Sequence, residues 1–153
     1  MTPMTRPTLA FLAFTLAAGG CAFVDEKIAL DPKSALPPGD VGHGQTVAIA
    51  VADERPNTAI GRRGPQRSAE IRASEDVAGV VERSVNQGLR AQGFRTVTPI
   101  TTEPVTLEVQ VRDLSYDASM GFWTGGIHTR AALKAIAHNA GQTYEQFYRA
   151  EKE

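Results

Sequence analysis

The sequence has only one cysteine, Cys21, so it can form no disulfide within the chain. Its longest N-terminal apolar stretch falls short of the roughly 20 residues that a helix needs to cross ~30 Å of hydrocarbon. Neither sign of charge dominates, because 16 Lys and Arg stand against 17 Asp and Glu. A general nucleic-acid-binding protein needs a basic surplus, so nucleic acid is not an expected partner.

Histidines are also few, and their spacing does not suit a metal site. His43 lies in a segment rich in proline and glycine, whereas His128 and His138 lie ten residues apart on one predicted strand. Ten residues of strand span about 33 Å, which is too far for two ligands of one metal. The zinc, nucleophile-elbow and phosphate-loop motifs are missing from the sequence as well. We therefore expect no metal, no cofactor and no enzymatic activity.

The first 20 residues have the pattern of a targeting segment. Arg6 and the amino terminus are weakly positive, and roughly ten mostly apolar residues follow over 9–18. Small residues then lead to Cys21, and this arrangement resembles the lipobox of bacterial lipoproteins. The resemblance implies cleavage before Cys21 and attachment of a diacylglycerol to its thiol. The alternative is a secreted protein cut near Ala18, which would leave Cys21 as a free thiol.

A lipid at Cys21 implies that the mature protein is anchored to a membrane. One acyl chain gives only marginal binding, with K of about 10⁴ M⁻¹, so the three chains typical of this class would hold the protein stably. Ala22 follows the cysteine, where an aspartate tends to retain such proteins in the inner membrane. By that analogy we expect the outer membrane, with the protein facing the periplasm.

The remaining chain divides into two regions. Residues 21–45 contain several prolines and glycines without a sustained apolar period, which predicts a flexible tether after the lipidated cysteine. Residues 46–153 have the length and pattern of a single α+β domain.

Within that domain the pattern predicts the order β-α-β-β-β, with an antiparallel sheet covered on one face by the helix. A short strand over 96–100 is an optional addition, and 59–73 has the composition of a mobile connection. The principal elements are expected at 46–52, 74–92, 104–114, 127–138 and 142–150.

Local signals refine these elements. Ser74 is the expected N-cap. Gly93 suits the left-handed position that ends a helix, with Phe94 folding back on Leu89. A change of apolar parity predicts a bulge near Arg112, and Asn139-Ala140-Gly141 predicts a hairpin turn.

Asp53 and Arg55 form the most promising polar pair, at the end of the first predicted strand. In one interpretation Arg55 binds an anionic group in a small recognition pocket. In the other, Asp53 caps the following turn and Arg55 pairs with a nearby carboxylate. The second interpretation is favoured. Catalysis is not expected from the pair, because no nucleophile or second acid–base group accompanies it.

Two further segments are candidates for partner binding. Arg62 and Arg63 belong to an arginine-rich stretch that suits glycan phosphates or anionic headgroups, although a solvated connection is the simpler interpretation. Phe122 and Trp123 are adjacent aromatics between glycines, so one ring is a candidate contact anchor and both are candidates for covering the sheet.

The residues also resemble the YajG-like lipoproteins. The resemblance rests on Val51-Ala52-Asp53-Glu54-Arg55 with Ile60-Gly61, on Arg90 to Phe94, on Pro104 to Val109, and on Tyr148-Arg149. It implies an envelope lipoprotein with no established activity and no catalytic residues. Relatives continue into a C-terminal helix beyond the last strand, so we expect an uncovered sheet face that favours a partner, a homodimer or low stability.

The expected function is therefore non-enzymatic binding of an envelope protein or glycan by a membrane-anchored lipoprotein. The alternative is an accessory or ligand-binding subunit of an envelope transport or surface-assembly complex. A hydrolase that uses Asp53 is the least favoured hypothesis.

Overall fold

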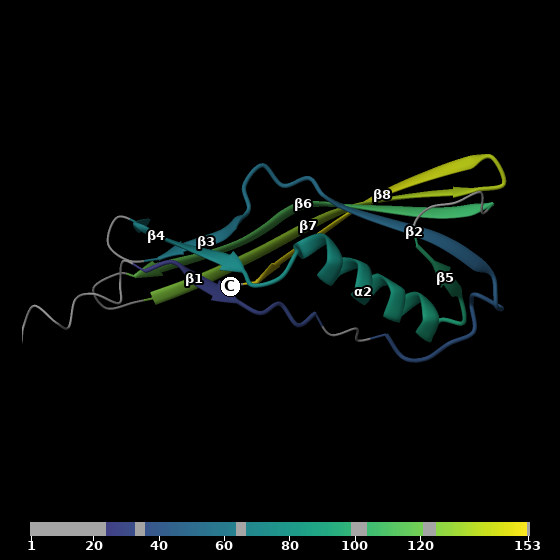
Figure 1. Ribbon diagram of the computed structural model, residues 1–153, viewed down its shortest axis with the longest axis horizontal. Helices are drawn as coiled ribbons and strands as arrows, with labels where there is room; N and C mark the ends of the chain where they lie inside the picture. Colours follow the sequence, from purple (N-terminus) through teal and green to yellow (C-terminus); the bar gives the residue numbers. More distant parts are fainter. Residues whose placement is uncertain (1–23, 33–35, 64–66, 99–103, 121–124, 153) are drawn as a thin grey trace, which may run out of the picture.

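The computed structural model describes residues 24–32, 36–63, 67–98, 104–120 and 125–152. Over these ranges the chain forms one curled mixed sheet of eight strands, and a single helix lies against part of it (Figure 1). The elements are β1 (Glu26–Ile28), β2 (Thr46–Asp53), β3 (Ala59–Arg63), β4 (Ala69–Ala73), α2 (Val77–Ala91), β5 (Arg95–Val97), β6 (Val105–Met120), β7 (Gly125–Asn139) and β8 (Gln142–Lys152).

The long strand β6 organises the sheet. On one side it pairs with β7 along its whole length, and β7 pairs in turn with β8. On its other side it pairs with β2 in its first half and with β3 near its end. The predicted bulge is confirmed, because the β6–β7 register shifts between Val111 and Asp113. This bulge lies where β6 changes partner from β2 to β3.

The expectation of an antiparallel sheet is correct only for part of the molecule. The pairs β3–β4, β6–β7 and β7–β8 are antiparallel, but β1–β4, β2–β5, β2–β6 and β3–β6 are parallel. Alternation of apolar and polar residues gives the same signal in either case, so the sequence pattern does not encode strand direction.

The predicted helix is confirmed with a small change at its start. Asp76 rather than Ser74 is the N-cap, and its Oδ2 accepts a hydrogen bond from Gly79 N at 2.8 Å. At the other end Gly93 has φ +82°. Phe94 N–H donates to the Leu89 carbonyl at 3.1 Å, which completes the expected glycine stop.

The core lies where α2 packs on β2 and β5. Ile49 is fully buried and Val47 is 5% exposed, and Val77 and Val80 bury one face of the helix. In the neighbouring strand β6, Val109 and Val111 are also buried, as their alternation predicted. Figure 1 shows that α2 covers only the half of the sheet that contains β2 and β5.

The arginine-rich stretch is not the mobile connection that we expected. It forms β3 and β4, which pair with each other, and β3 also joins β6. The two strands do contain apolar residues between the charged ones, namely Ile60, Ala69 and Ile71, and all three are buried. Two strands of five residues with so few apolar positions are too short for their apolar–polar alternation to be recognised in the sequence.

The flexible tether is a wrong interpretation for the described part of 21–45. Glu26–Ile28 forms β1 and pairs in parallel with β4. Further along, Gly39 N donates to the Ala91 carbonyl at 2.8 Å, and Gly42 N donates to the Gln92 carbonyl at 2.7 Å. The segment therefore satisfies carbonyl groups that the end of α2 leaves without partners in the helix.

A Gly42→Ala variant tests this docking. A Cβ at Gly42 would lie 2.6 Å from Phe94 N and 2.7 Å from Gly93 C, both backbone atoms that cannot rotate away. We expect a loss of about 1–3 kcal/mol in the free energy of unfolding, measured by urea titration. Gly39→Ala is the matched control, since its Cβ would meet the flexible side chain of Gln92. Equal urea midpoints for both variants and the wild type would show that this segment is not docked.

The predicted hairpin turn between β7 and β8 is confirmed. Ala140 has φ +49° and Gly141 has φ +79°, the two positive values of a type I′ turn. Beyond this turn Asn139 pairs with Gln142, and the register continues without a shift to Thr129 and Lys152.

In the described part of the chain, no helix has the length and apolar content to cross a membrane.

Candidate functional site

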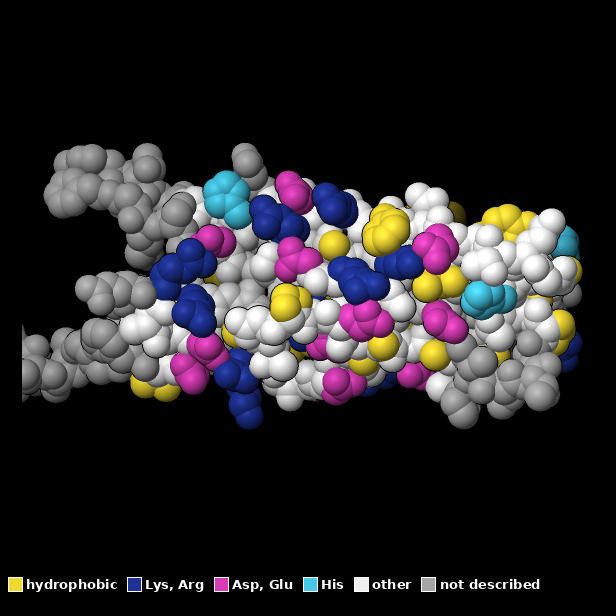
Figure 2. Space-filling view, turned by 90° about the horizontal axis from the view of Figure 1, so that it is seen from above, with side chains coloured by type: hydrophobic (Ala, Val, Ile, Leu, Met, Phe, Trp, Pro, Cys, Tyr) yellow, Lys and Arg dark blue, Asp and Glu magenta, His cyan; other side chains and the backbone are white. Residues whose placement is uncertain are grey.

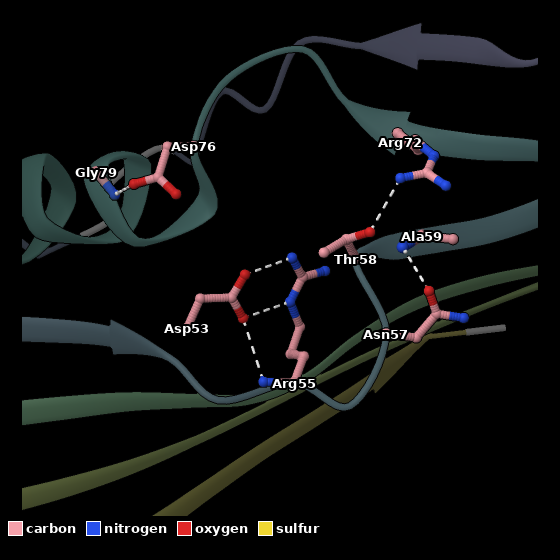
Figure 3. A network of polar contacts seen from close by, with 8 residues as sticks. All are labelled: Asp53, Arg55, Asn57, Thr58, Ala59, Arg72, Asp76 and Gly79. Carbon is pink, nitrogen blue, oxygen red and sulfur yellow. Dashed lines mark hydrogen bonds and ion pairs between the residues drawn. The ribbon is translucent and has the colours of Figure 1, made fainter.

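Asp53 and Arg55 form a closed ion pair where β2 ends (Figure 3). Arg55 Nε donates to Asp53 Oδ1 at 2.7 Å, and Arg55 Nη2 donates to Asp53 Oδ2 at 2.7 Å. The Arg55 backbone N–H also points at Asp53 Oδ1, at 3.3 Å. The Arg55 side chain is only 4% exposed and that of Asp53 is 23% exposed. This two-point geometry fixes the guanidinium against β2.

The pair shifts both protonation equilibria toward the charged forms. Hydrogen bonds from the Arg55 side chain lower the pKa of Asp53 below its ordinary value of 3.8, although partial burial opposes this shift. The carboxylate in turn raises the pKa of Arg55. Both groups are therefore charged at neutral pH, and neither is poised to exchange a proton there.

This geometry favours the internal pairing of Arg55 over recognition of a ligand. Two of its three guanidinium nitrogens bind Asp53, and the third, Nη1, is buried without a hydrogen-bond partner among the described residues. The adjoining loop is held in a similar way, as Asn57 Oδ1 accepts from Ala59 N at 2.9 Å (Figure 3). Arg55 thus belongs to the framework of the fold.

The arginines of β3 and β4 are also paired. Arg62 and Arg72 share Glu70, at 3.3 Å and 2.5 Å. Arg63 Nη1 lies 2.6 Å from Glu26, and its Nη2 donates to the Val24 carbonyl at 3.1 Å. Arg63 therefore ties β3 to the segment at β1, which is a structural role that the sequence did not indicate.

Arg62 lines a cleft of about 670 Å³. Walls of this cleft come from the loop before β3, from β3, and from β6, β7 and β8. Figure 2 shows the side of the molecule away from α2, where basic and acidic side chains are interspersed. The charged residues of the lining, apart from His128, are Arg62, Arg67, Arg130, Lys152, Asp117 and Glu151.

Two ion pairs lie in the lining of the cleft. Arg67 Nη2 lies 3.2 Å from Asp117 Oδ2, and Arg130 Nε lies 3.0 Å from Glu151 Oε1. All four side chains are more than half exposed, so these pairs are accessible to solvent and are worth little as stabilising contacts. The sequence did not indicate that Arg67 and Arg130 line one cleft, because they come from different parts of the chain.

A second, apolar hollow of about 350 Å³ lies where the sheet curls. Ile28 and Leu30 line it from the β1 side, and Ala150 lines it from β8, with Leu114 and Tyr116 between them. Strands at opposite edges of the sheet therefore face the same hollow. Tyr144 and Tyr148, more than half exposed, lie farther along β8.

Residues 32–153 match a family described as uncharacterized lipoproteins. The chain belongs to this lipoprotein family. The match spans α2 and every strand of the sheet except β1, which lies before residue 32. Membership places the protein among the lipoproteins of the bacterial cell envelope; the narrower YajG-like affiliation stays a prediction.

Solved structures share the fold of this lipoprotein at low sequence identity. An uncharacterized protein aligns with a TM-score of 0.53 at 10% identity, covering 85% of this chain and 80% of its own. The protein XCC0632 from Xanthomonas campestris aligns with a TM-score of 0.51 at 15% identity, covering 84% and 77%. No curated protein matches the chain. These similarities concern the fold alone.

Three sequence-predicted sites of this lipoprotein lie outside the described residues: Cys21, Phe122 and Trp123. Their proposed roles stay predictions. His128 and His138 lie on one strand, β7, as expected. Among the described residues, no group of three or more His, Cys, Asp or Glu is arranged to hold a metal ion.

Proposed function

We propose that this lipoprotein is anchored through Cys21 in the outer membrane, faces the periplasm, and acts by binding rather than by catalysis. The family supports the envelope location, and the lipobox-like sequence supports the anchor. The binding role is supported by the polar pair that was the best catalytic candidate. Asp53 and Arg55 bind each other through two hydrogen bonds and Arg55 is almost fully buried, so the pair offers a substrate neither a free base nor an accessible cation.

The cleft between β3, β6, β7 and β8 is the proposed binding site. The observation that carries this proposal is the set of four cations, Arg62, Arg67, Arg130 and Lys152, around two carboxylates in a hollow of about 670 Å³. Arginines bind phosphate and carboxylate groups through two parallel hydrogen bonds. The proposed ligand is therefore an anionic group of an envelope glycan, such as a sugar phosphate.

The ion pairs within the cleft are compatible with exchange for such a ligand. Arg67 and Arg130 are each 58% exposed, and their present partners are solvated carboxylates. Glu70 forms ion pairs with both Arg62 and Arg72, so Arg62, which lines the cleft, shares its counter-charge with a second arginine. An incoming phosphate would replace weak, screened contacts with two-point hydrogen bonds.

A titration with glucose 1-phosphate, followed by NMR of backbone amides, tests the site. We expect shifts at the cleft that saturate, and at least a tenfold weaker affinity in an Arg67→Gln/Arg130→Gln variant, since both cationic contacts are lost. Arg83→Gln is the control, because Arg83 lies on α2, outside the lining of the cleft, and pairs with Glu75 at 2.6 Å. The proposal fails if uncharged glucose gives the same shifts, or if the control loses as much affinity.

A further inference from the structure

We propose that the outer edge of β8 pairs with β8 of a second copy of this chain, which joins two sheets into one. Within the described residues, β8 pairs with β7 on one side and with no strand on the other. This edge is eleven residues long, whereas the edge strands β1 and β5 have three residues each. The proposal is independent of the ligand proposed for the cleft.

The β8 edge lacks most of the features that keep exposed strands from pairing. Proteins block such edges with prolines, bulges, short strands or charged side chains, especially lysines. β8 has no proline or glycine, its register with β7 is unbroken, and its only lysine is the last residue, Lys152. Three large side chains, Tyr144, Phe147 and Tyr148, are 56–61% exposed along it.

The sequence of β8 is complementary to itself in one antiparallel register. A two-fold axis at Phe147 pairs Gln142 with Lys152 of the second copy, and so uses all eleven residues. The same register sets Glu145 opposite Arg149 of the second copy, on both sides of the axis. Directly opposite charges stabilise an antiparallel pair.

Neighbouring registers lose this match. A shift of two residues in one direction sets Glu145 opposite Glu151 of the second copy, so like charges face each other. The shift in the other direction sets Glu145 opposite Phe147 and leaves Arg149 opposite Thr143. Each shift also leaves two residues of β8 unpaired. The full-length register is therefore also the register with matched charges.

The side chains concerned are available for this contact. Arg149 is exposed and has no ion-pair partner within the part of the chain that is described. Glu145 is half exposed and uses Oε2 to bind Lys134 at 2.8 Å, which leaves Oε1 as an acceptor. Phe147 lies against Lys134, whose Nζ is 5.5 Å from the ring centre, and its outer edge faces solvent.

Pairing through β8 would also arrange the two clefts. The axis is perpendicular to the sheet, so both clefts open on the same face. Glu151 would lie opposite Thr143 of the second copy, which separates the two Glu151 positions by about 27 Å along the strand. The dimer would then present two equivalent clefts on one face.

Cysteine cross-linking of the full chain in its native membrane tests the register. A Phe147→Cys substitution sets two cysteines opposite each other across the axis, with Cα atoms at about 4.5–5.5 Å, within the range of a disulfide. We expect oxidation with copper-phenanthroline to give a dimer of twice the monomer mass. Glu145→Cys alone should not cross-link, because its two copies would be about 13 Å apart. The parent chain, which keeps Cys21, controls for that thiol.

A second variant protects the test against a folding effect of Phe147→Cys. The double substitution Glu145→Cys/Arg149→Cys leaves Phe147 in place and should also cross-link, although neither single substitution should. Dimers in both Phe147→Cys and the double variant, but not in Glu145→Cys, support the proposed pairing. Monomers throughout, or equal cross-linking of Glu145→Cys, overturn it.

Discussion

Replacing Cys21 with serine is expected to move the protein from the membrane to the soluble periplasmic fraction. Residues 1–20 should be exchanged for an ordinary cleavable secretory leader in this experiment, so that the variant is still processed. The expected reason is the loss of the lipid, since several acyl chains anchor a protein stably and one chain binds only with K of about 10⁴ M⁻¹. Fractionation and immunoblotting measure the change.

The native leader with Cys21 intact is the matched control. Mass spectrometry of its mature N-terminal peptide should show Cys21 as the first residue, carrying the added mass of lipid. Density-gradient separation of inner and outer membranes then tests the proposed outer-membrane location. A free thiol at Cys21, or a serine variant that stays in washed membranes, would contradict the anchor.

Removing the Asp53 carboxylate should produce the largest loss of stability among the charged residues. In an Asp53→Ala variant, Arg55, whose side chain is 4% exposed in the wild type, loses its two-point partner. We expect the free energy of unfolding to fall by about 2–3 kcal/mol, somewhat less than for fully buried pairs because Asp53 is partly solvated. Urea titration monitored by circular dichroism measures this loss.

Two companion variants separate the pair from general effects. Glu75→Ala removes a carboxylate from the exposed Arg83 pair and should cost less than about 1 kcal/mol. Asp53→Ala/Arg55→Met replaces both charges and should recover much of the loss, because no unpaired charge is left. If Asp53→Ala unfolds like Glu75→Ala, the ion pair does not stabilise the fold.

The stability difference between wild type and Asp53→Ala should depend on pH in a defined direction. Because the folded-state pKa of Asp53 is lowered from 3.8, the pair contributes fully above that value. Its contribution disappears as the pH falls from about 4 through the lowered pKa. The free energies of unfolding of the wild type and the Asp53→Ala variant should therefore converge at acid pH and differ most near neutral pH.

The elements that the sequence predicted correctly carry their signal within a few residues. The helix over Val77–Ala91 has a four-residue apolar repeat and a glycine stop at Gly93. The turn at Ala140 and Gly141 requires two positive φ angles, and the bulge at Arg112 appears as a change of parity. These features follow from local steric and hydrogen-bonding preferences.

The elements that the sequence did not predict depend on distant partners. β1 has three residues and exists as a strand because β4 lies beside it, and Arg63 binds Glu26 across that junction. The segment around Gly42 has the composition of a linker. The Gly42 N–H nevertheless donates a hydrogen bond to a carbonyl at the end of α2. Composition predicts the conformational flexibility of an isolated segment. The contacts that order the segment come from residues elsewhere in the chain.

The candidate functional residues also differ in whether their contacts are local in the sequence or come from distant parts of the chain. Asp53 and Arg55 are two residues apart, so the sequence could place them together and favour their pairing. The cleft brings Arg67 beside Asp117 and Arg130 beside Glu151 from separate strands and loops, and only the register of β6, β7 and β8 decides that.

By itself, then, the sequence determined the lipobox-like start, the one helix, the long strands and their turns, because backbone propensity and side-chain alternation act over short stretches. Tertiary structure alone decided the strand directions, the docking of the early segment, the basic cleft and the open edge of β8. Those features arise when residues far apart in the chain satisfy one another's hydrogen bonds and charges, a long-range energy that no local pattern records.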